Sequence, residues 1–282
     1  MDIKKTLMRP LLIAMFISLW ITPAAFGWGE LGHRLVAEYG TPLADAKALA
    51  NCHTTSALLV AHASDPDKIW RQQRFMHPHE AEMHFFHIDR QPNDWRRRTS
   101  PQDTKQGRLI YHVIDFLDEA ARQRKAGNWD KLSEILYGLV HYVGDLTQPL
   151  HLHHDYDGDE AGLPDLHAQF ESKMLNRFET ETRSGIKSRL AAEKIPEIWQ
   201  TIPLRELIFD TAEQSSLKVA RLFASANPAM GMPHQSRRHK SKRQPEPRFD
   251  KKLLWQHTGE LAMNQLALGA RLWAQVFNSV CR

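Results

Sequence analysis

The segment that most constrains this chain is residues 141–171, because it gathers metal-ligand side chains at helical spacing. Among its side chains are two imidazole–carboxylate pairs with a spacing of four, His141 with Asp145 and His167 with Glu171, and His151 between them. Residues four apart project from one face of a helix. Imidazole and carboxylate groups that converge on one point are the ligands that zinc accepts. So many ligands exceed the needs of one tetrahedral ion, so the segment predicts a cluster of ions and hydrolytic chemistry.

The first of these pairs lies near the end of a helix expected over residues 129–146. Histidine and aspartate at this spacing can also form an ordinary surface pair or a satisfied core pair. Here His141 and Asp145 lie beside an apolar stripe, where charge is costly unless it is paired or bound to a metal. Pro149 then ends the helix and turns the chain, so that His151 can return toward the same place. The stripe is formed by Leu132, Ile135, Leu136, Leu139, Val140, Val143 and Leu146.

The first residues of the chain read as a signal peptide. A basic start precedes an apolar run over residues 11–21 and small residues that lead up to Gly27. The run is short for a membrane span, which needs ~20 apolar residues, although an uncleaved anchor is the alternative. Cleavage after Gly27 divides the chain into a signal peptide, 1–27, and one domain, 28–282. We therefore expect an exported protein, periplasmic or secreted, with no transmembrane segment in the mature chain.

Cleavage at this point would make Trp28 the first residue of the mature protein. A free α-amino group has a pKa near ~8 and can lose its proton to bind zinc. The amine and carbonyl of Trp28, together with the ring of His33, can hold one ion. The alternative is that Trp28 is an ordinary aromatic residue.

Charge and cysteine content leave the partner open. The formal net charge of +4 is small for a chain of 282 residues. Residues 234–252 form a basic, proline-containing stretch without periodicity, which suits either binding of phosphate groups or a solvated insertion. The only two cysteines, Cys52 and Cys281, either pair in a disulfide, as is common in exported proteins, or stay free and buried.

Helical periodicity dominates the chain, and no stretch shows sustained alternation of apolar and polar residues. The length suits one domain with a substantial core. The fold class predicted is therefore all-α, a single-domain multi-helix bundle. Helices are expected over residues 30–40, 43–60, 104–126, 129–146, 164–181, 203–225 and 252–278.

Two motifs resemble the S1/P1 nuclease family, which is related to the zinc-dependent phospholipases C. They are Trp28-Gly-x-x-Gly-His33 and His141-Tyr-Val-Gly-Asp-Leu-Thr-Gln-Pro-Leu-His151. The resemblance extends over nearly all of residues 28–282. It implies a helical fold of the phospholipase C/P1 nuclease type that binds three zinc ions and hydrolyses phosphodiesters.

The resemblance also distributes the ligands among the three ions. It points to Asp67 as a ligand, with Asp65 as a local competitor that suits a turn before Pro66, and to His84 in preference to His87. The family pattern implies one ion held by Asp67, His84, His141 and Asp145, a second by Trp28, His33 and the other oxygen of Asp145, and a third by His151, His167 and Glu171. The eleven other histidines, including His112, His153 and His154, are assigned to the surface or core by default.

The family's chemistry gives Asp67 a catalytic role as well, to orient the attacking water and accept its proton. Three departures from the family pattern concern the substrate, and one is the short loop between His151 and His167. The loop at 157–162 lacks the family's usual Gly-Gly-Asn. At position 171 this chain has Glu, which is similar to the phospholipases, whereas nucleases usually have Asp. The N-terminal motif favours cleavage of single-stranded DNA or RNA. Hydrolysis of phospholipid head groups is the alternative, and a non-catalytic metal-binding protein is a third possibility.

A nuclease of this kind needs groups that bind phosphate and stack on bases. Arg71 is a candidate phosphate ligand. Separately, we expect the protein to act as a monomer. The candidate stacking residues, for which burial in the core is the alternative, are Phe85 and Phe86, followed by Trp70 and Trp95.

Overall fold

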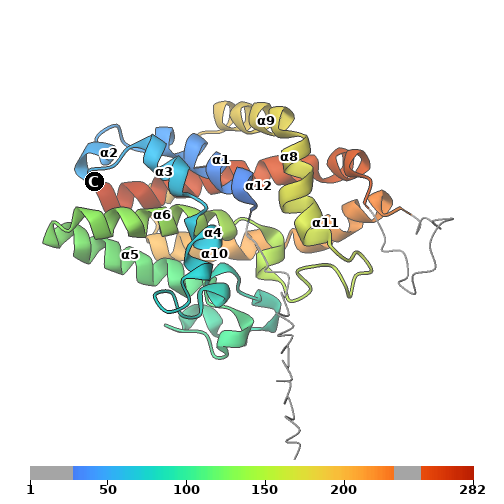
Figure 1. The fold of residues 1–282 in the computed structure, drawn as a ribbon, viewed down its shortest axis with the longest axis horizontal. Helices are drawn as coiled ribbons and strands as arrows, with labels where there is room; N and C mark the ends of the chain where they lie inside the picture. Colours follow the sequence, from blue (N-terminus) through green and yellow to red (C-terminus); the bar gives the residue numbers. More distant parts are fainter. Residues whose placement is uncertain (1–27, 232–248) are drawn as a thin grey trace, which may run out of the picture.

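The computed structural model describes residues 28–231 and 249–282, and this part of the chain is built from helices. It contains no sheet within these residues, only isolated bridges between Phe86 and Gly107 and between Met230 and Phe249. The all-α prediction is confirmed (Figure 1). The α-helices are α1 (Glu30–Gly40), α2 (Ala48–Asn51), α3 (Ser56–His62), α4 (Asp65–Lys68), α5 (Leu109–Ala126), α6 (Trp129–Asp145), α7 (Leu166–Ala168), α8 (Leu175–Arg177), α9 (Glu179–Ala192), α10 (Leu204–Ser216), α11 (Val219–Ala226) and α12 (Lys251–Cys281).

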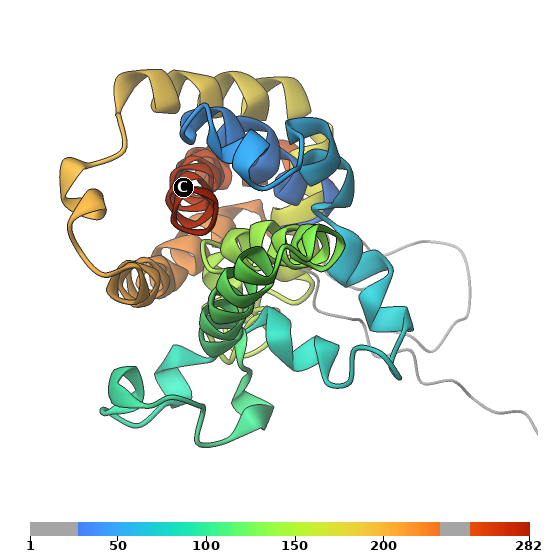
Figure 2. The same ribbon diagram turned by 90° about the vertical axis from the view of Figure 1, so that its left-hand side faces the viewer.

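The long helix α12 runs through the middle of the molecule, and the other helices surround it (Figure 2). It packs against α1, α6, α9, α10 and α11. Its start is fixed by Asp250, whose side chain accepts hydrogen bonds from the backbone N–H groups of Lys252 and Leu253. Nearly every residue of α12 from Gln265 to Cys281 is buried, whereas its first half keeps an exposed polar face.

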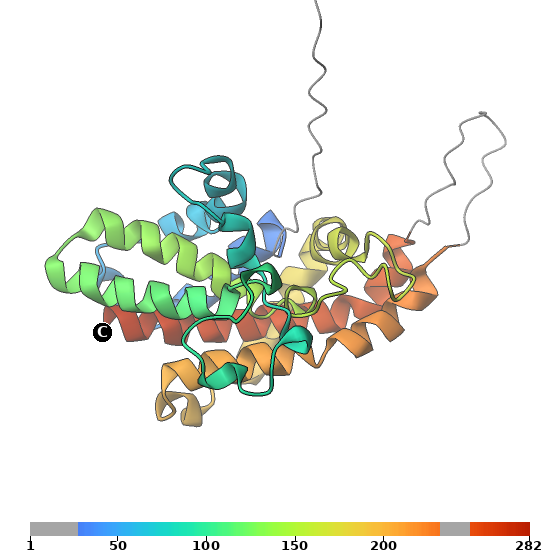
Figure 3. The ribbon, with the colours of Figure 1, turned by 90° about the horizontal axis from the view of Figure 1, so that it is seen from below.

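Helices α5 and α6 form an antiparallel hairpin, visible in Figures 1 and 3. The turn between them requires a left-handed residue, and Gly127 supplies it with φ of 70°. The buried face of α6 carries the apolar stripe predicted from the sequence, and the last turn of the same face carries His141 and Asp145. The hairpin thus places two of the expected ligands in the interior.

Several expected helices are interrupted. The helix expected over 43–60 breaks at His53, which has a left-handed φ of 50°, and Thr55 then starts α3 by accepting a hydrogen bond from Leu58 N–H. The region 164–181 contains a π-helical turn, Gln169–Met174, between α7 and α8. Helix α9 was largely missed by the sequence analysis because it buries only Thr182 and Ile186, too few residues for a periodic signal.

Cys52 and Cys281 form a disulfide, with their Cα atoms 5.4 Å apart. The pairing alternative is therefore confirmed, and the bond ties the end of α2 to the end of α12. The expected signal peptide and most of the basic stretch 234–252 lie outside the described residues. Among the described helices, none combines the length and apolar character that crossing a membrane requires.

Loss of the disulfide should reduce stability, because it closes a loop across most of the chain. We expect Cys52→Ser with Cys281→Ser to lower the free energy of unfolding by about 2–5 kcal/mol, measured by urea denaturation. A reductant should bring the unmodified protein to the same value and leave the double variant unaffected. Equal stability of the two proteins under oxidising conditions would contradict this assignment.

Candidate metal centre

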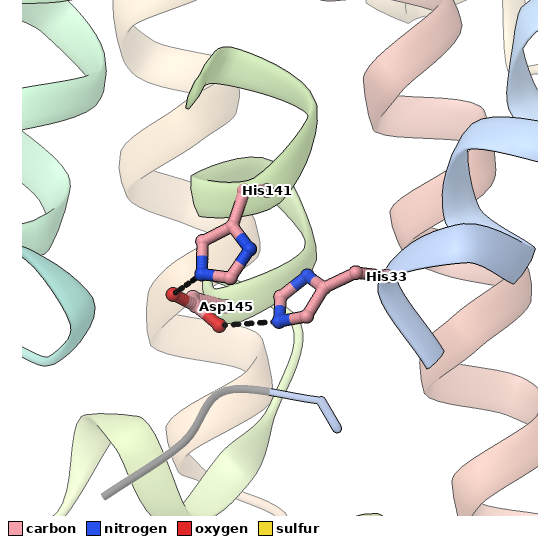
Figure 4. Close-up of side chains that lie close together, drawn as sticks. All are labelled: His33, His141 and Asp145. Atoms are coloured by element: carbon pink, nitrogen blue, oxygen red, sulfur yellow. Dashed lines mark ion pairs between the residues drawn. The ribbon is translucent and has the colours of Figure 1, made fainter. Parts of the chain in front are cut away.

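Asp145 lies between two imidazole rings that come from different helices (Figure 4). Its Oδ2 is 3.4 Å from Nε2 of His141, one turn earlier on α6, and its Oδ1 is 3.4 Å from Nε2 of His33 on α1. All three side chains are fully buried. The two oxygens of one carboxylate thus face two different imidazole rings, as expected for a residue that bridges two ions.

Asp67 and His84 complete the first group from the other side. Asp67 lies on the short helix α4, and His84 ends the 3₁₀ turn Glu80–His84. Nδ1 of His84 is 3.5 Å from Oδ1 of Asp67, 3.1 Å from Oδ2 of Asp145 and 3.0 Å from Nε2 of His141. Four residues from three segments therefore converge as the sequence analysis expected.

The third expected group also assembles. Nε2 of His167 is 3.1 Å from Nε2 of His151 and 2.7 Å from Oε2 of Glu171, and all three side chains are buried. His151 lies in the 3₁₀ turn Pro149–Leu152, and Glu171 lies in the π-helical turn. The ring of His151 also faces Asp145, with Nδ1 3.6 Å from Oδ1, so the three groups adjoin one another.

The spacing of these atoms fits zinc. Nitrogen and oxygen ligands lie about 2.0–2.2 Å from a zinc ion, so neighbouring ligand atoms of a tetrahedron are about 3.3 Å apart. The distances between facing atoms in the first group run from 3.0 Å, between His84 and His141, to 3.8 Å, between His141 and Asp67. The residues therefore fit the metal that their chemistry predicts.

Hydrogen bonds fix which ring nitrogens face the centre. Nδ1 of His141 donates to the carbonyl oxygen of Ala63 at 2.8 Å, and Nε2 of His84 donates to Oε1 of Glu80 at 3.2 Å. In the neutral rings, the remaining nitrogens carry lone pairs. Those two lone pairs face each other across 3.0 Å in the protein interior. Such an arrangement is repulsive unless a cation lies between them.

Other buried polar atoms of the centre are also suited to binding a cation. Within the described part of the chain, neither ring nitrogen of His33 makes a hydrogen bond, nor does Oδ1 of Asp145. Buried polar atoms without hydrogen bonds are rare in folded proteins and need an explanation, of which a bound ion is one. Burial lowers the pKa of His141 to about 3, which keeps its ring in the neutral form that binds metal. Burial, reinforced by the charge of Asp67, raises the pKa of Asp145 well above its ordinary value, so its charged form needs a cation.

Trp28 lies at the edge of this centre. Its side chain is fully buried, with the indole N–H donating to Oγ1 of Thr147 at 3.4 Å and the ring packed on Phe170. A Cβ atom at Gly144 would come within 2.8 Å of His33 Nδ1 and 3.8 Å of Trp28 Cδ1. Gly144 therefore permits the close approach of α1 and the start of the domain to Asp145. The role of the Trp28 amine as a ligand stays a prediction.

Glu80 is a functional residue that the sequence analysis missed. Its buried Oε1 accepts hydrogen bonds from Nε2 of His84 and from the hydroxyl of Tyr142, the neighbour of His141. A carboxylate on the outer nitrogen of a histidine fixes the ring and strengthens it as a metal ligand. The signal was present in the spacing of four between Glu80 and His84, but an exposed helical pair gives the same pattern.

The substrate-binding candidates divide between the surface and the core. Arg71 lies beside the centre, with Nε 3.4 Å from Oδ1 of Asp67. Phe85 is partly exposed and stacks on His87, at 4.7 Å between ring centroids. His87 is nearly parallel to Tyr156, at 6.4 Å, and Tyr156 lies beside His167. A row of aromatic rings, formed by Phe85, His87 and Tyr156, thus lies next to the third group.

The other aromatic candidates belong to the core, which corrects the expectation that they stack on bases. Phe86 is fully buried and packs on Trp95 and Tyr111. Trp95 stacks on Phe209, and Trp70 packs on His77. Phe85 and Phe86 are adjacent in an extended segment, so their side chains point to opposite sides and only one can face solvent.

Comparison with known proteins identifies the class to which this all-helical fold and buried ligand cluster belong. The S1/P1 nuclease family model matches residues 28–238, a range that includes every expected metal ligand. The chain belongs to the S1/P1 nuclease family, and this membership indicates a hydrolase of the nuclease or phosphodiesterase type. A comparison with curated proteins finds no match.

The contact between Glu80 and His84 predicts an effect on metal affinity. Glu80→Gln should weaken zinc binding about 10–100-fold, because the amide lacks the charge that strengthens His84 as a ligand. Competition with a chromophoric chelator measures this affinity. Glu82→Gln, the same change two residues away at a partly exposed position, is the matched control and should leave the affinity unchanged. Equal affinities of the two variants would remove Glu80 from the centre.

Metal removal should make stability depend on pH above neutrality. Burial raises the pKa of Glu80 to about 7, and that of Glu171 well above its ordinary value. Between about pH 6.5 and 8 the folded, metal-free protein therefore holds more protons than the unfolded chain, and its stability falls as pH rises. The buried histidines have lowered pKa values and are neutral in the folded state, whereas in the unfolded chain their ordinary pKa of 6.5 leaves them half protonated at pH 6.5 and neutral above about pH 7.5. They offset part of the fall near pH 6.5, but the raised pKa values of Glu80, Glu171 and Asp145 act across the whole window and set its sign.

Thermal unfolding of chelated protein at pH 6.5 and pH 8 tests this sign. We expect a midpoint several degrees lower at pH 8, since each kcal/mol corresponds to about 2–4 °C for a domain of this size. Zinc-loaded protein is the control, because bound cations keep the carboxylates ionised throughout. A midpoint of the chelated protein that rises from pH 6.5 to 8 would contradict the burial of these carboxylates.

Proposed function

We propose that the protein is an exported, zinc-dependent nuclease that hydrolyses phosphodiester bonds of single-stranded DNA or RNA and acts as a monomer. The observation that carries the zinc requirement is the pair of imidazole lone pairs facing each other across 3.0 Å in the buried centre. Three groups of ligands correspond to three ions. Zinc bound here would supply an activated water and concentrated positive charge for attack on an anionic phosphodiester.

Asp67 and Arg71 are the residues assigned to the reacting phosphate. Asp67 is buried but is 8% exposed, whereas His84 and His141 are fully buried, so it is the member of the first group that solvent can still reach. Burial raises its pKa to about 6, which suits a carboxylate that orients a water and accepts its proton. The guanidinium of Arg71 lies next to it and can bind a non-bridging phosphate oxygen.

The row formed by Phe85, His87 and Tyr156 supports nucleic acid as the substrate. Proteins that bind single strands without strong sequence preference stack bases on aromatic rings beside their phosphate contacts. The row adjoins His167 of the third group, so a base on these rings would hold its phosphate near the ions. The family match begins at Trp28, which supports cleavage after Gly27 and an amine ligand from the new N-terminus.

One observation favours the phospholipase alternative. In the loop between Gln72 and Glu80, Phe75 is 99% exposed and Met76 is 71% exposed. The loop joins the turn that carries Arg71 to the turn that carries His84. Exposed apolar side chains beside a phosphodiesterase centre are what a lipid surface would contact.

Hydrolysis by mature protein that begins at Trp28 separates the two substrates. We expect zinc-loaded protein to cleave single-stranded DNA, chelated protein to be inactive, and phosphatidylcholine vesicles to stay intact. Hydrolysis of the vesicles without cleavage of DNA would replace the nuclease by a phospholipase. A folded, zinc-loaded protein inactive on both would favour a non-catalytic metal-binding role.

Paired variants test the aromatic row. Phe85→Ala should raise KM for single-stranded DNA by about 10-fold with a smaller change in kcat, because stacking contributes about 1–3 kcal/mol per base. Phe75→Ala is the matched control for an exposed phenylalanine and should leave both constants unchanged. A larger effect of Phe75→Ala would move the binding surface to the loop after Gln72.

A bridging role of Asp145 predicts the loss of more than one ion. Asp145→Asn should reduce the zinc content by two ions and hydrolysis by at least about 100-fold, because its two oxygens face two groups of ligands. Elemental analysis of the purified variant measures the zinc content. Unchanged zinc content would contradict the bridging role.

A further inference from the structure

A second set of metal-type ligands lies outside the buried centre. Asp89, His153 and His154 present ligand atoms that all lie within 4.8 Å of one another. From the sequence, both histidines are expected at the surface or in the core. None of these three residues belongs to the three buried groups, and we name them the rim cluster.

We propose that the rim cluster binds a further divalent metal ion, with zinc as the ion that its chemistry fits best. Two imidazoles and one carboxylate are a donor set that zinc accepts. The side chains are 22–30% exposed, so an ion can enter from solvent and complete its coordination with water. The site therefore differs from the buried centre in access.

The geometry of the rim cluster is similar to that of the third buried group. Nδ1 of His154 contacts Oδ2 of Asp89 closely, and Nε2 of His153 lies 4.0 Å from the same oxygen. The corresponding distances in the third group are 2.7 Å, between His167 and Glu171, and 3.9 Å, between His151 and Glu171. Both imidazoles of the rim cluster thus share one carboxylate oxygen as neighbour.

Surrounding contacts hold two of the three ligands in place. Nε2 of His154, the nitrogen away from Asp89, is 3.0 Å from Oε2 of Glu160. A carboxylate on the outer nitrogen is typical of metal-bound histidines. Oδ1 of Asp89 accepts the backbone N–H of His154 at 3.0 Å, which leaves Oδ2 directed at the cluster.

His153 is the weakest of the three ligands. Its Nδ1 accepts the backbone N–H of Asp155 at 3.1 Å. Metal binding through Nε2 requires the proton on Nδ1, and this hydrogen bond is then lost. We therefore expect the rim ion to be released before the ions of the buried centre during chelation.

An ion in the rim cluster would join two segments that also carry buried ligands. Phe86 N–H donates to the carbonyl oxygen of His151 at 2.8 Å, and Nδ1 of His151 donates to that of His84. The rim cluster links the same two segments a few residues further on, through Asp89 and His154. Binding to the folded state alone would stabilise this junction.

Zinc counting by native mass spectrometry tests the proposal on the mature, zinc-saturated protein. The double variant His153→Asn with His154→Asn should hold one ion fewer than the unmodified protein. His62→Asn is the matched control, because His62 pairs with Asp65 at 2.7 Å in an ordinary ion pair on the surface. It should retain the full count. Equal counts for the double variant and the unmodified protein would overturn the proposal.

The position of the ion distinguishes the rim cluster from the nearby third group. Crystals of the zinc-loaded protein should give an anomalous peak about 2.0–2.2 Å from Asp89 Oδ2 and His154 Nδ1. That peak should be absent from the double variant, while the peaks of the buried centre persist. Peaks at the buried centre alone in the unmodified protein would overturn the proposal, whatever the substrate of the enzyme.

Discussion

The rest of the structure is arranged around a buried cluster of imidazole and carboxylate groups whose polar atoms are not all paired with other protein groups. His84 and His141 direct lone pairs at each other across 3.0 Å, and neither ring nitrogen of His33 has a hydrogen-bond partner among residues 28–231 and 249–282. Each of these groups is fully buried, where an unpaired polar atom is costly. A cation removes these costs together, because it converts each facing pair into two ligands of one ion. The interior of the fold is therefore destabilised unless positive charge is bound there.

The surrounding helices hold the ligand side chains in fixed positions. Helix α6 carries His141 and Asp145 on its last buried turn, and α1 brings His33 to the other oxygen of Asp145. Backbone carbonyls and Glu80 then hold the outer nitrogens of the rings, so each ring presents a defined nitrogen to the centre. The long helix α12 supports this arrangement by packing against both α1 and α6.

Neighbouring side chains around the centre differ in exposure, and this difference bears on how a substrate would reach the centre. Phe86 turns into the core while Phe85, its neighbour, lies partly exposed beside His87. Asp67 and Arg71 keep a small exposed fraction, 6% and 12% of their side chains, through which a phosphodiester would reach them, whereas His84, His141 and Asp145 are fully buried. A substrate would thus reach the candidate metal centre from the side of Asp67 and Arg71.

The sequence by itself determined the helical class and the family and predicted the candidate ligands, because these depend on local spacing and on motifs long enough to be specific. The sequence did not predict the π-helical turn that carries Glu171 or the helix α9, since neither produces a clear apolar period. The pairing of Cys52 with Cys281 was one of two alternatives until their Cα atoms were found 5.4 Å apart. Which of two adjacent phenylalanines faces solvent, and that Glu80 supports His84, were decided only by the tertiary structure. Such choices depend on contacts between segments distant in the chain, and a local pattern contains no information about which segments will meet.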